Sequence, residues 1–134
     1  LPSISVQTLG KETIAVADSR DPSWFRYWSL ETHLGHQPNR IHPTMSLTEE
    51  LELVAAGVAC SITIASAARY MPRPGVRYIP ITGVPPCLTG LAWNPMTASP
   101  QTQRFVETAV AVRDESRTVV DYIENPFEDT SATP

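Results

Sequence analysis

At 134 residues, 42% of them hydrophobic and 18% charged, the chain has the size of one domain that can bury a core of its own. Its net charge of -4, from 10 Lys and Arg against 14 Asp and Glu, comes without a basic cluster and argues against nucleic-acid binding by this chain alone. Two cysteines without paired spacing, Cys60 and Cys87, and apolar runs well short of about 20 residues predict a cytoplasmic domain without a disulfide scaffold or a membrane anchor.

The first part of the chain alternates between strand and helix patterns. In chain order we expect a connector over 1–12, a strand over 13–17, a helix over 22–34 and a short strand over 40–42. Asp21 followed by Pro22 is typical of a helix start, because the carboxylate can accept from a free amide and proline is favoured at the first helical position. Gly35 is expected to end that helix.

Residues 46–66 form the clearest unit of the sequence, a capped helix followed by a buried strand. Ser46 and Glu49 have the spacing of a capping box, in which the serine accepts from the Glu49 amide and the glutamate reaches back to the Ser46 amide. One face of the helix is apolar, and Gly57 is placed to close it in a left-handed conformation. The nearly continuous apolar run over 58–65 predicts a strand covered on both faces, as in a parallel sheet.

The remainder of the chain is more broken. We expect a helical turn over 66–70, a proline-rich break over 71–75, strands over 76–81 and 88–93, a helix over 100–112 and a mobile acidic tail over 113–134. A small apolar group in that tail could dock locally; it consists of Val119, Val120, Tyr122 and Ile123. The alternation of strands and helices favours an α/β fold with a mostly parallel sheet flanked by helices.

Several segments resemble a known family when they are taken in order. They read LVAAGVACSITIAS, ARYMPRPGVRYIPITGVPP, LAWNP and SPQTQRFVETAV, and the Asp21, Pro22 and Trp24 region adds to them. This order is similar to the second lobe and C-terminal helix of the effector-binding domain of LysR-type transcriptional regulators. The resemblance covers residues 13–112 and implies one lobe of a type II periplasmic-binding-protein-like fold. Ile64 and Ala59 depart from it, since the family usually has proline and often glycine there.

The resemblance implies an effector-sensing regulatory domain, not an enzyme. The family's winged helix-turn-helix, linker helix and first lobe would precede this segment, so a chain that begins at Leu1 instead of Met is expected to be a fragment. DNA would be bound only through that absent N-terminal domain, and the parent protein would be a homo-oligomer that binds its effector between two lobes. The alternative is a solute-binding lobe of a transport system, which shares the architecture.

Three loops are candidates for contact with a small-molecule effector. Ligands of wound α/β sheets bind beyond the carboxyl ends of the strands, and the resemblance places the effector at loops of the same kind. The candidate residues are Ser19 and Arg20 in the first loop, Pro43, Thr44, Met45 and Ser46 in the second, and Thr63 and Ser66 in the third. Free amides at the first helix start favour an anionic effector. The alternative for Asp21 and Ser46 is that they only cap helices.

Other chemistries have weaker support in the sequence. His33, His36 and His42 lack a cysteine or an acidic residue at a familiar ligand spacing, so we expect no metal and no cofactor. Cys60 lies in an apolar run, which favours an inert buried thiol over a redox role with Cys87. No nucleophile lies in an elbow motif such as GxSxG. The aromatic run Trp24, Phe25, Tyr27 and Trp28 could be core, or an interface to a missing lobe or a second subunit.

Overall fold

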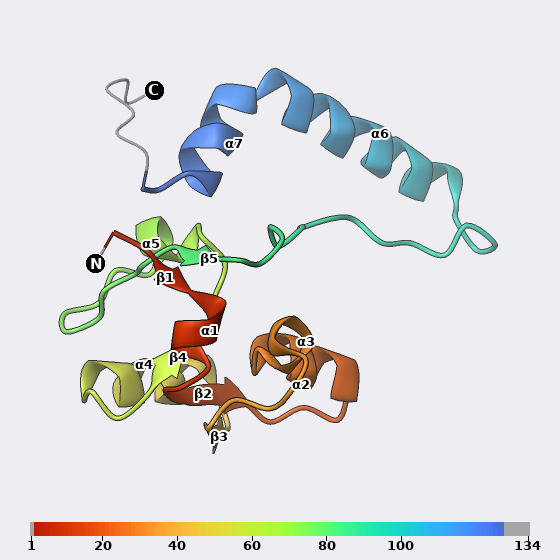
Figure 1. Ribbon diagram of the computed structural model, residues 1–134. Helices are drawn as coiled ribbons and strands as arrows, with labels where there is room; N and C mark the ends of the chain where they lie inside the picture. The colour runs from red at the N-terminus through yellow and green to blue at the C-terminus, as the bar shows by residue number, and fades with distance from the viewer. Residues whose placement is uncertain (1, 128–134) are drawn as a thin grey trace. The chain divides into compact units, whose positions relative to one another are not determined.

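A computed structural model of the chain describes residues 2–127 and has an α/β fold of small parallel sheets flanked by helices. The described residues form two compact units, the first ending at Pro85 and the second beginning at Pro86. The sequence suggests a boundary later in the chain, between 112 and 113. Figure 1 shows the elements of each unit.

The main sheet of the first unit has three strands in the order β3-β2-β4, all parallel. They are β2 (Thr13–Ala17), β3 (Arg40–Thr44) and β4 (Cys60–Ser61). A second, two-stranded parallel sheet pairs β1 (Ile4–Ser5) with β5 (Ile81–Thr82). The predicted parallel sheet is confirmed, and β2 has the predicted bounds.

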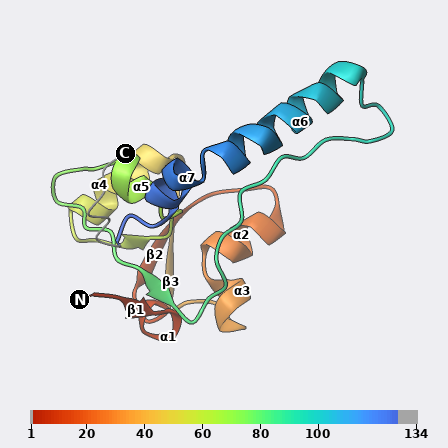
Figure 2. The ribbon, with the colours of Figure 1, turned by 90° about the horizontal axis from the view of Figure 1, so that it is seen from above.

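Helices cover both faces of the three-stranded sheet. The helix α4 (Leu47–Ala55) contacts all three strands, whereas α2 (Pro22–Trp28) contacts β2. Figures 1 and 2 show α4 on one side of the strands and α2, with α3 (Glu31–Leu34), on the other. This arrangement follows from the strand order, because the crossover from β2 to β3 and the crossover from β3 back past β2 to β4 run in opposite directions across the sheet. Right-handed crossovers in opposite directions place their helices on opposite faces.

The core of the first unit begins in the segment that the sequence predicts to be a connector. Residues 4–9 instead form β1 and the short helix α1 (Val6–Leu9). Val6 and Leu9 are buried and pack with Ile14 and Leu30. The prediction for 1–12 is therefore wrong in this part, since too few apolar residues alternate there to reveal a strand of two residues and a helix of four.

The single helix predicted over 22–34 is two helices, α2 and α3, separated at Leu30. Asp21 caps α2 as expected, and Gly35 has the predicted left-handed conformation with a φ of 76°. Leu30 also has a positive φ, 69°, which no regular helix accommodates. Its side chain is only 1% exposed and belongs to the core. Burial of this leucine explains why the chain tolerates the backbone break.

The strand predicted over 58–65 is much shorter than expected. Only Cys60 and Ser61 pair with β2, and the apolar side chains on either side, Val58 and Ile64, are exposed. Gly57 has the predicted left-handed conformation, with a φ of 70°. The predicted strand over 76–81 is likewise reduced to β5, and no strand forms over 88–93. An apolar run therefore overestimates strand length when few partner residues are available to pair with it.

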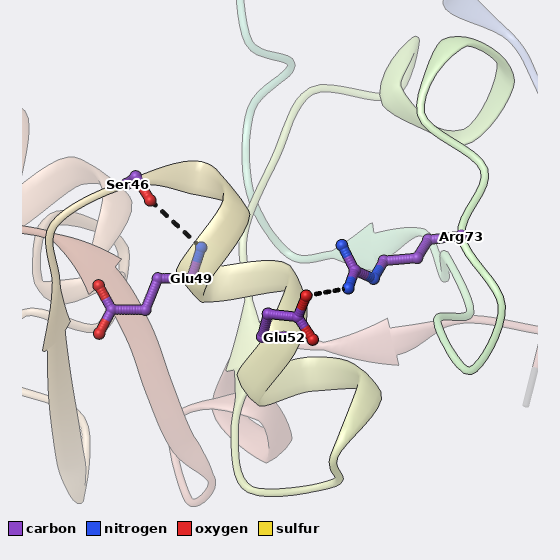
Figure 3. Close-up of polar contacts among 4 residues, drawn as sticks. All are labelled: Ser46, Glu49, Glu52 and Arg73. Atoms are coloured by element: carbon purple, nitrogen blue, oxygen red, sulfur yellow. Dashed lines mark hydrogen bonds and ion pairs between the residues drawn. The ribbon is translucent and has the colours of Figure 1, made fainter.

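The proline-rich segment that follows α5 (Ala67–Tyr70) packs against α4. Arg73 forms an ion pair with Glu52 of α4, as Figure 3 shows. A Cβ atom on Gly75 would lie 3.5 Å from the Ala55 carbonyl oxygen, so this glycine packs directly over the end of the helix. The break predicted over 71–75 is thus a packed loop of the first unit.

The second unit consists of an extended segment followed by two helices. Ser99 caps α6 (Pro100–Glu115), which extends the helix predicted over 100–112, and α7 (Arg117–Glu124) follows directly. Part of the predicted mobile tail is therefore helical, while its last residues, 128–134, lie outside the described part of the chain. None of the described residues from Pro86 onward is buried.

Candidate functional site

The carboxyl ends of β2, β3 and β4 meet at one edge of the main sheet because the three strands are parallel. Ala17 ends β2 in register with Thr44 of β3, and Ser61 ends β4 beside Ala15. We call this the carboxyl edge. Each of the three predicted loops leaves the sheet there, as the sequence predicts for a wound α/β layer.

The loop after β2 is organised around its own polar side chains. Ser19 accepts from the Asp21 amide at 3.1 Å, and Asp21 Oδ1 accepts from the amides of Ser23 at 2.8 Å and Trp24 at 3.4 Å. Arg20 is exposed. Because the Asp21 carboxylate occupies amides at the start of α2, the reason for expecting an anion there no longer holds.

The loop between β3 and α4 is held by a modified form of the predicted capping box. Ser46 Oγ accepts from the Glu49 amide at 3.3 Å, as expected, and Figure 3 shows this bond. The Glu49 carboxylate, however, accepts from the Met45 amide at 2.7 Å instead of the Ser46 amide. The reciprocal arm of the box is thus one residue earlier than predicted, and it fixes the residue at the mouth of the loop.

The two loops are joined directly. The Asp18 amide donates to the Thr44 carbonyl oxygen at 2.9 Å, which continues the β2–β3 pairing past the end of β2. Pro43, Met45 and Ser46 are exposed at this position, and Met45 is 87% exposed. Side chains from both loops can therefore contact a molecule at the carboxyl edge.

The third loop is less closely tied to the other two. Thr63 is exposed in the segment after β4, and Ser66 is half-buried at the N-cap position of α5 without a side-chain cap bond. One hydrogen bond, from the Asp18 amide to Thr44, thus joins the loop that contains Ser19 and Arg20 to the β3–α4 loop. Thr63 and Ser66 only follow the neighbouring strand β4.

A buried carboxylate lies under the carboxyl edge, on the α4 side of the sheet. Glu50 is 7% exposed. Its Oε2 accepts from Ser61 Oγ at 2.5 Å, and its Oε1 accepts from Thr44 Oγ1 through a longer contact of 3.4 Å. Thr44 is 1% exposed, so its hydroxyl faces Glu50 and not the solvent. The Thr44 side chain, a predicted effector contact, is therefore buried beneath the carboxyl edge and is not exposed to a ligand there.

Sequence reasoning missed Glu50 and Ser61. Glu50 lies three residues after Leu47 and four before Val54, so the helical repeat places it on the same face of the helix as these two apolar residues. A carboxylate on the buried face of an amphipathic helix requires hydrogen-bond partners. That requirement was the available signal, but the sequence alone could not show which hydroxyls would meet it.

Among residues 2–127, no group of three or more His, Cys, Asp and Glu side chains is placed to hold a metal ion. Both cysteines are free; burial, with a smaller effect of Glu12, raises the pKa of the Cys60 thiol. A raised pKa leaves less of the reactive thiolate at neutral pH.

Three residues of the aromatic run form a cluster on α2 that extends to His33 of α3. Trp28 lies between Trp24 and Tyr27, with ring centroids 6.2 Å and 5.1 Å away, and Tyr27 meets His33 edge-on at 5.0 Å. Trp24 is partly exposed and Trp28 half-buried. The cluster is therefore only partly buried by the described first unit.

Comparisons with family models, curated proteins and solved structures found no match for this chain. Within the described residues, no helix combines the length and the apolar character that crossing a membrane requires.

Proposed function

We propose that this chain is a ligand-sensing lobe that binds a small molecule at the carboxyl edge of its β3-β2-β4 sheet. The observation that supports this most is the junction of two polar loops at that edge, made by the Asp18 to Thr44 hydrogen bond. The strand order supports it as well, because β3 and β4 lie on opposite sides of β2. Such a reversal of strand order is where open α/β sheets bind ligands.

The parent protein that we propose is a LysR-type transcriptional regulator, on the strength of the ordered sequence segments. In that setting the lobe would bind its effector against a first lobe, and the bound state would alter DNA binding by an N-terminal winged helix-turn-helix. Binding and not catalysis is the proposed activity. The capped helix starts and the raised pKa of Cys60 both argue against an exposed, activated nucleophile here.

A titration of the isotope-labelled chain with small organic compounds tests this proposal. The panel contains monocarboxylates, dicarboxylates, aromatic acids and primary amines, each followed through backbone amide NMR shifts. We expect at least one class to shift a contiguous set of amides in the two joined loops, at 18–20 and 43–46. Shifts that lie only elsewhere, or a panel without any binder, would contradict the proposal.

The proposal that the parent protein is a transcriptional regulator is tested separately, with the intact protein. The affinity of the intact protein for promoter DNA should change in the presence of the compound that shifts the loop amides. DNA binding that stays the same with every such compound would remove the regulator from the proposal and would favour a solute-binding lobe, because the carboxyl-edge site would still bind its ligand.

A further inference from the structure

On the face of the main sheet that α4 covers, β2 has small side chains and the flanking strands have hydroxyls. Side chains alternate along β2, so Ile14 and Val16 point to one face and Ala15 and Ala17 to the other. Ile14 belongs to the apolar core. Thr44 is in register with Ala17, and Ser61 with Ala15. These four side chains therefore share a face, and the two alanines leave space for a longer side chain above β2.

Glu50 is the side chain of α4 that reaches hydroxyls on both flanking strands. It contacts Thr44 on β3 and Ser61 on β4, which lie on either side of β2. Each of its two carboxylate oxygens accepts from one of these hydroxyls. The 2.5 Å contact with Ser61 is the shorter of the two. Glu50 thus links the ends of two strands that do not pair with each other.

The same helical turn also fixes the loop that the proposed ligand would contact. Glu49 holds the Met45 amide, while Glu50 holds Thr44, whose carbonyl oxygen accepts from the Asp18 amide. Thr44 is therefore held through its hydroxyl on one side and through its carbonyl on the other. Displacement of its side chain would disturb both joined loops.

We propose that Glu50 is a positioning residue. By bridging Thr44 on β3 and Ser61 on β4 it fixes Thr44, and through the hydrogen bond between Thr44 and Asp18 it sets the relative positions of the β2 and β3 loops at the carboxyl edge. Its importance for ligand binding rests on the proposed function, but its positioning role does not. Its principal effect is on geometry and not on stability, because a buried carboxylate with its partners can be replaced by apolar groups of similar shape at little cost in stability.

Amide hydrogen exchange of the ligand-free chain tests the positioning role without any ligand. The reporter is the Asp18 amide, bonded to Thr44 at the carboxyl edge. The Asn39 amide is the internal control, since it donates to the Gly10 carbonyl oxygen at the same distance of 2.9 Å and has no bond to the Glu50 bridge. The variants are Glu50→Gln, Glu50→Leu and the triple variant Thr44→Val, Glu50→Leu, Ser61→Ala.

Each variant has a distinct expected result. Glu50→Gln can still accept from one hydroxyl and donate to the other, so Asp18 exchange should stay near the parent rate. In Glu50→Leu, Asp18 should exchange at least about tenfold faster, with Asn39 unchanged. The triple variant should unfold at nearly the urea concentration of the parent, because no buried hydroxyl is left unpaired, yet keep the fast Asp18 exchange.

Two outcomes would overturn the proposal. One is parent-like Asp18 exchange in the triple variant, because the loops would then keep their positions through packing, without any hydrogen bond from residue 50. The other is equal exchange of the Asp18 amide in Glu50→Gln and Glu50→Leu. If the triple variant fails to fold, this comparison alone tests the proposal. A positive exchange result combined with a ligand panel that has no binder would instead count against the proposed function and leave the positioning role intact.

Discussion

Leu30 combines two features that rarely occur together, a left-handed backbone and a buried aliphatic side chain. Its φ of 69° is the one positive value at a non-glycine position in the described chain. A left-handed conformation costs an ordinary residue about 1 to 2 kcal/mol. The cost is offset because the side chain packs with Val6, Leu9 and Ile14 in the core. Leu30 thus shows tertiary packing overriding a local preference, and this explains why the helix predicted over 22–34 is interrupted.

We predict that glycine is tolerated better than alanine at this position. Leu30→Ala removes the packed side chain and should cost about 2 to 5 kcal/mol in the free energy of unfolding. Leu30→Gly removes it as well but relieves the backbone strain, so it should be more stable than Leu30→Ala by about 1 kcal/mol. Urea unfolding of both variants measures the difference.

Leu53 supplies the matched control because it lies inside α4 with an ordinary helical backbone. There the order should reverse, with Leu53→Gly less stable than Leu53→Ala by about 1 kcal/mol. The same order of glycine and alanine at both positions would mean that the backbone of Leu30 is not strained.

At the scale of elements, α4 organises the carboxyl edge. Its first turn provides Ser46 and Glu49 for the loop and Glu50 for the strands, while Glu52 holds the segment around Arg73. The two acidic residues in that first turn, Glu49 and Glu50, also lie where the helix dipole favours negative charge. Each of these contacts depends on where α4 begins, so the N-cap is the natural position at which to test the element.

We predict that Ser46→Ala lowers the free energy of unfolding by about 1 kcal/mol, because the Glu49 amide loses its acceptor. Ser66→Ala is the matched control, since Ser66 also occupies an N-cap position but makes no side-chain cap bond. Its effect should stay within about 0.5 kcal/mol. Equal losses for the two variants in urea unfolding would show that the Ser46 bond does not stabilise α4.

Local signals in the sequence were sufficient to predict the starts of α2 and α4 and the glycines that follow α3 and α4. Asp21 and Ser46 were predicted caps and are caps, and Gly35 and Gly57 have the expected left-handed backbone. Such features depend on a few neighbouring residues. Strand lengths and the polar contacts of Glu50 depend on partners far along the chain, and neither could be predicted from one sequence.

At the scale of the whole molecule, the described chain divides into a unit with a core and a unit without one. The buried residues all lie before Pro85, around β2 and the helices that flank it. The second unit leaves Leu88, Met96 and Phe105 exposed. The carboxyl edge lies entirely within the first unit, so the unit with the packed core is also the one that holds the candidate site.

The central claim, that the carboxyl edge binds a small molecule, is tested most directly by a pair of methionine variants. Met45 is 87% exposed at that edge, and Met96 is 90% exposed in the second unit. Substitution of either methionine by alanine should therefore leave the free energy of unfolding unchanged. We predict that Met45→Ala weakens binding of the compound found by amide shifts about three- to tenfold, through loss of its apolar contact, whereas Met96→Ala leaves the Kd unchanged. Equal Kd values for both variants and the parent chain would contradict the account.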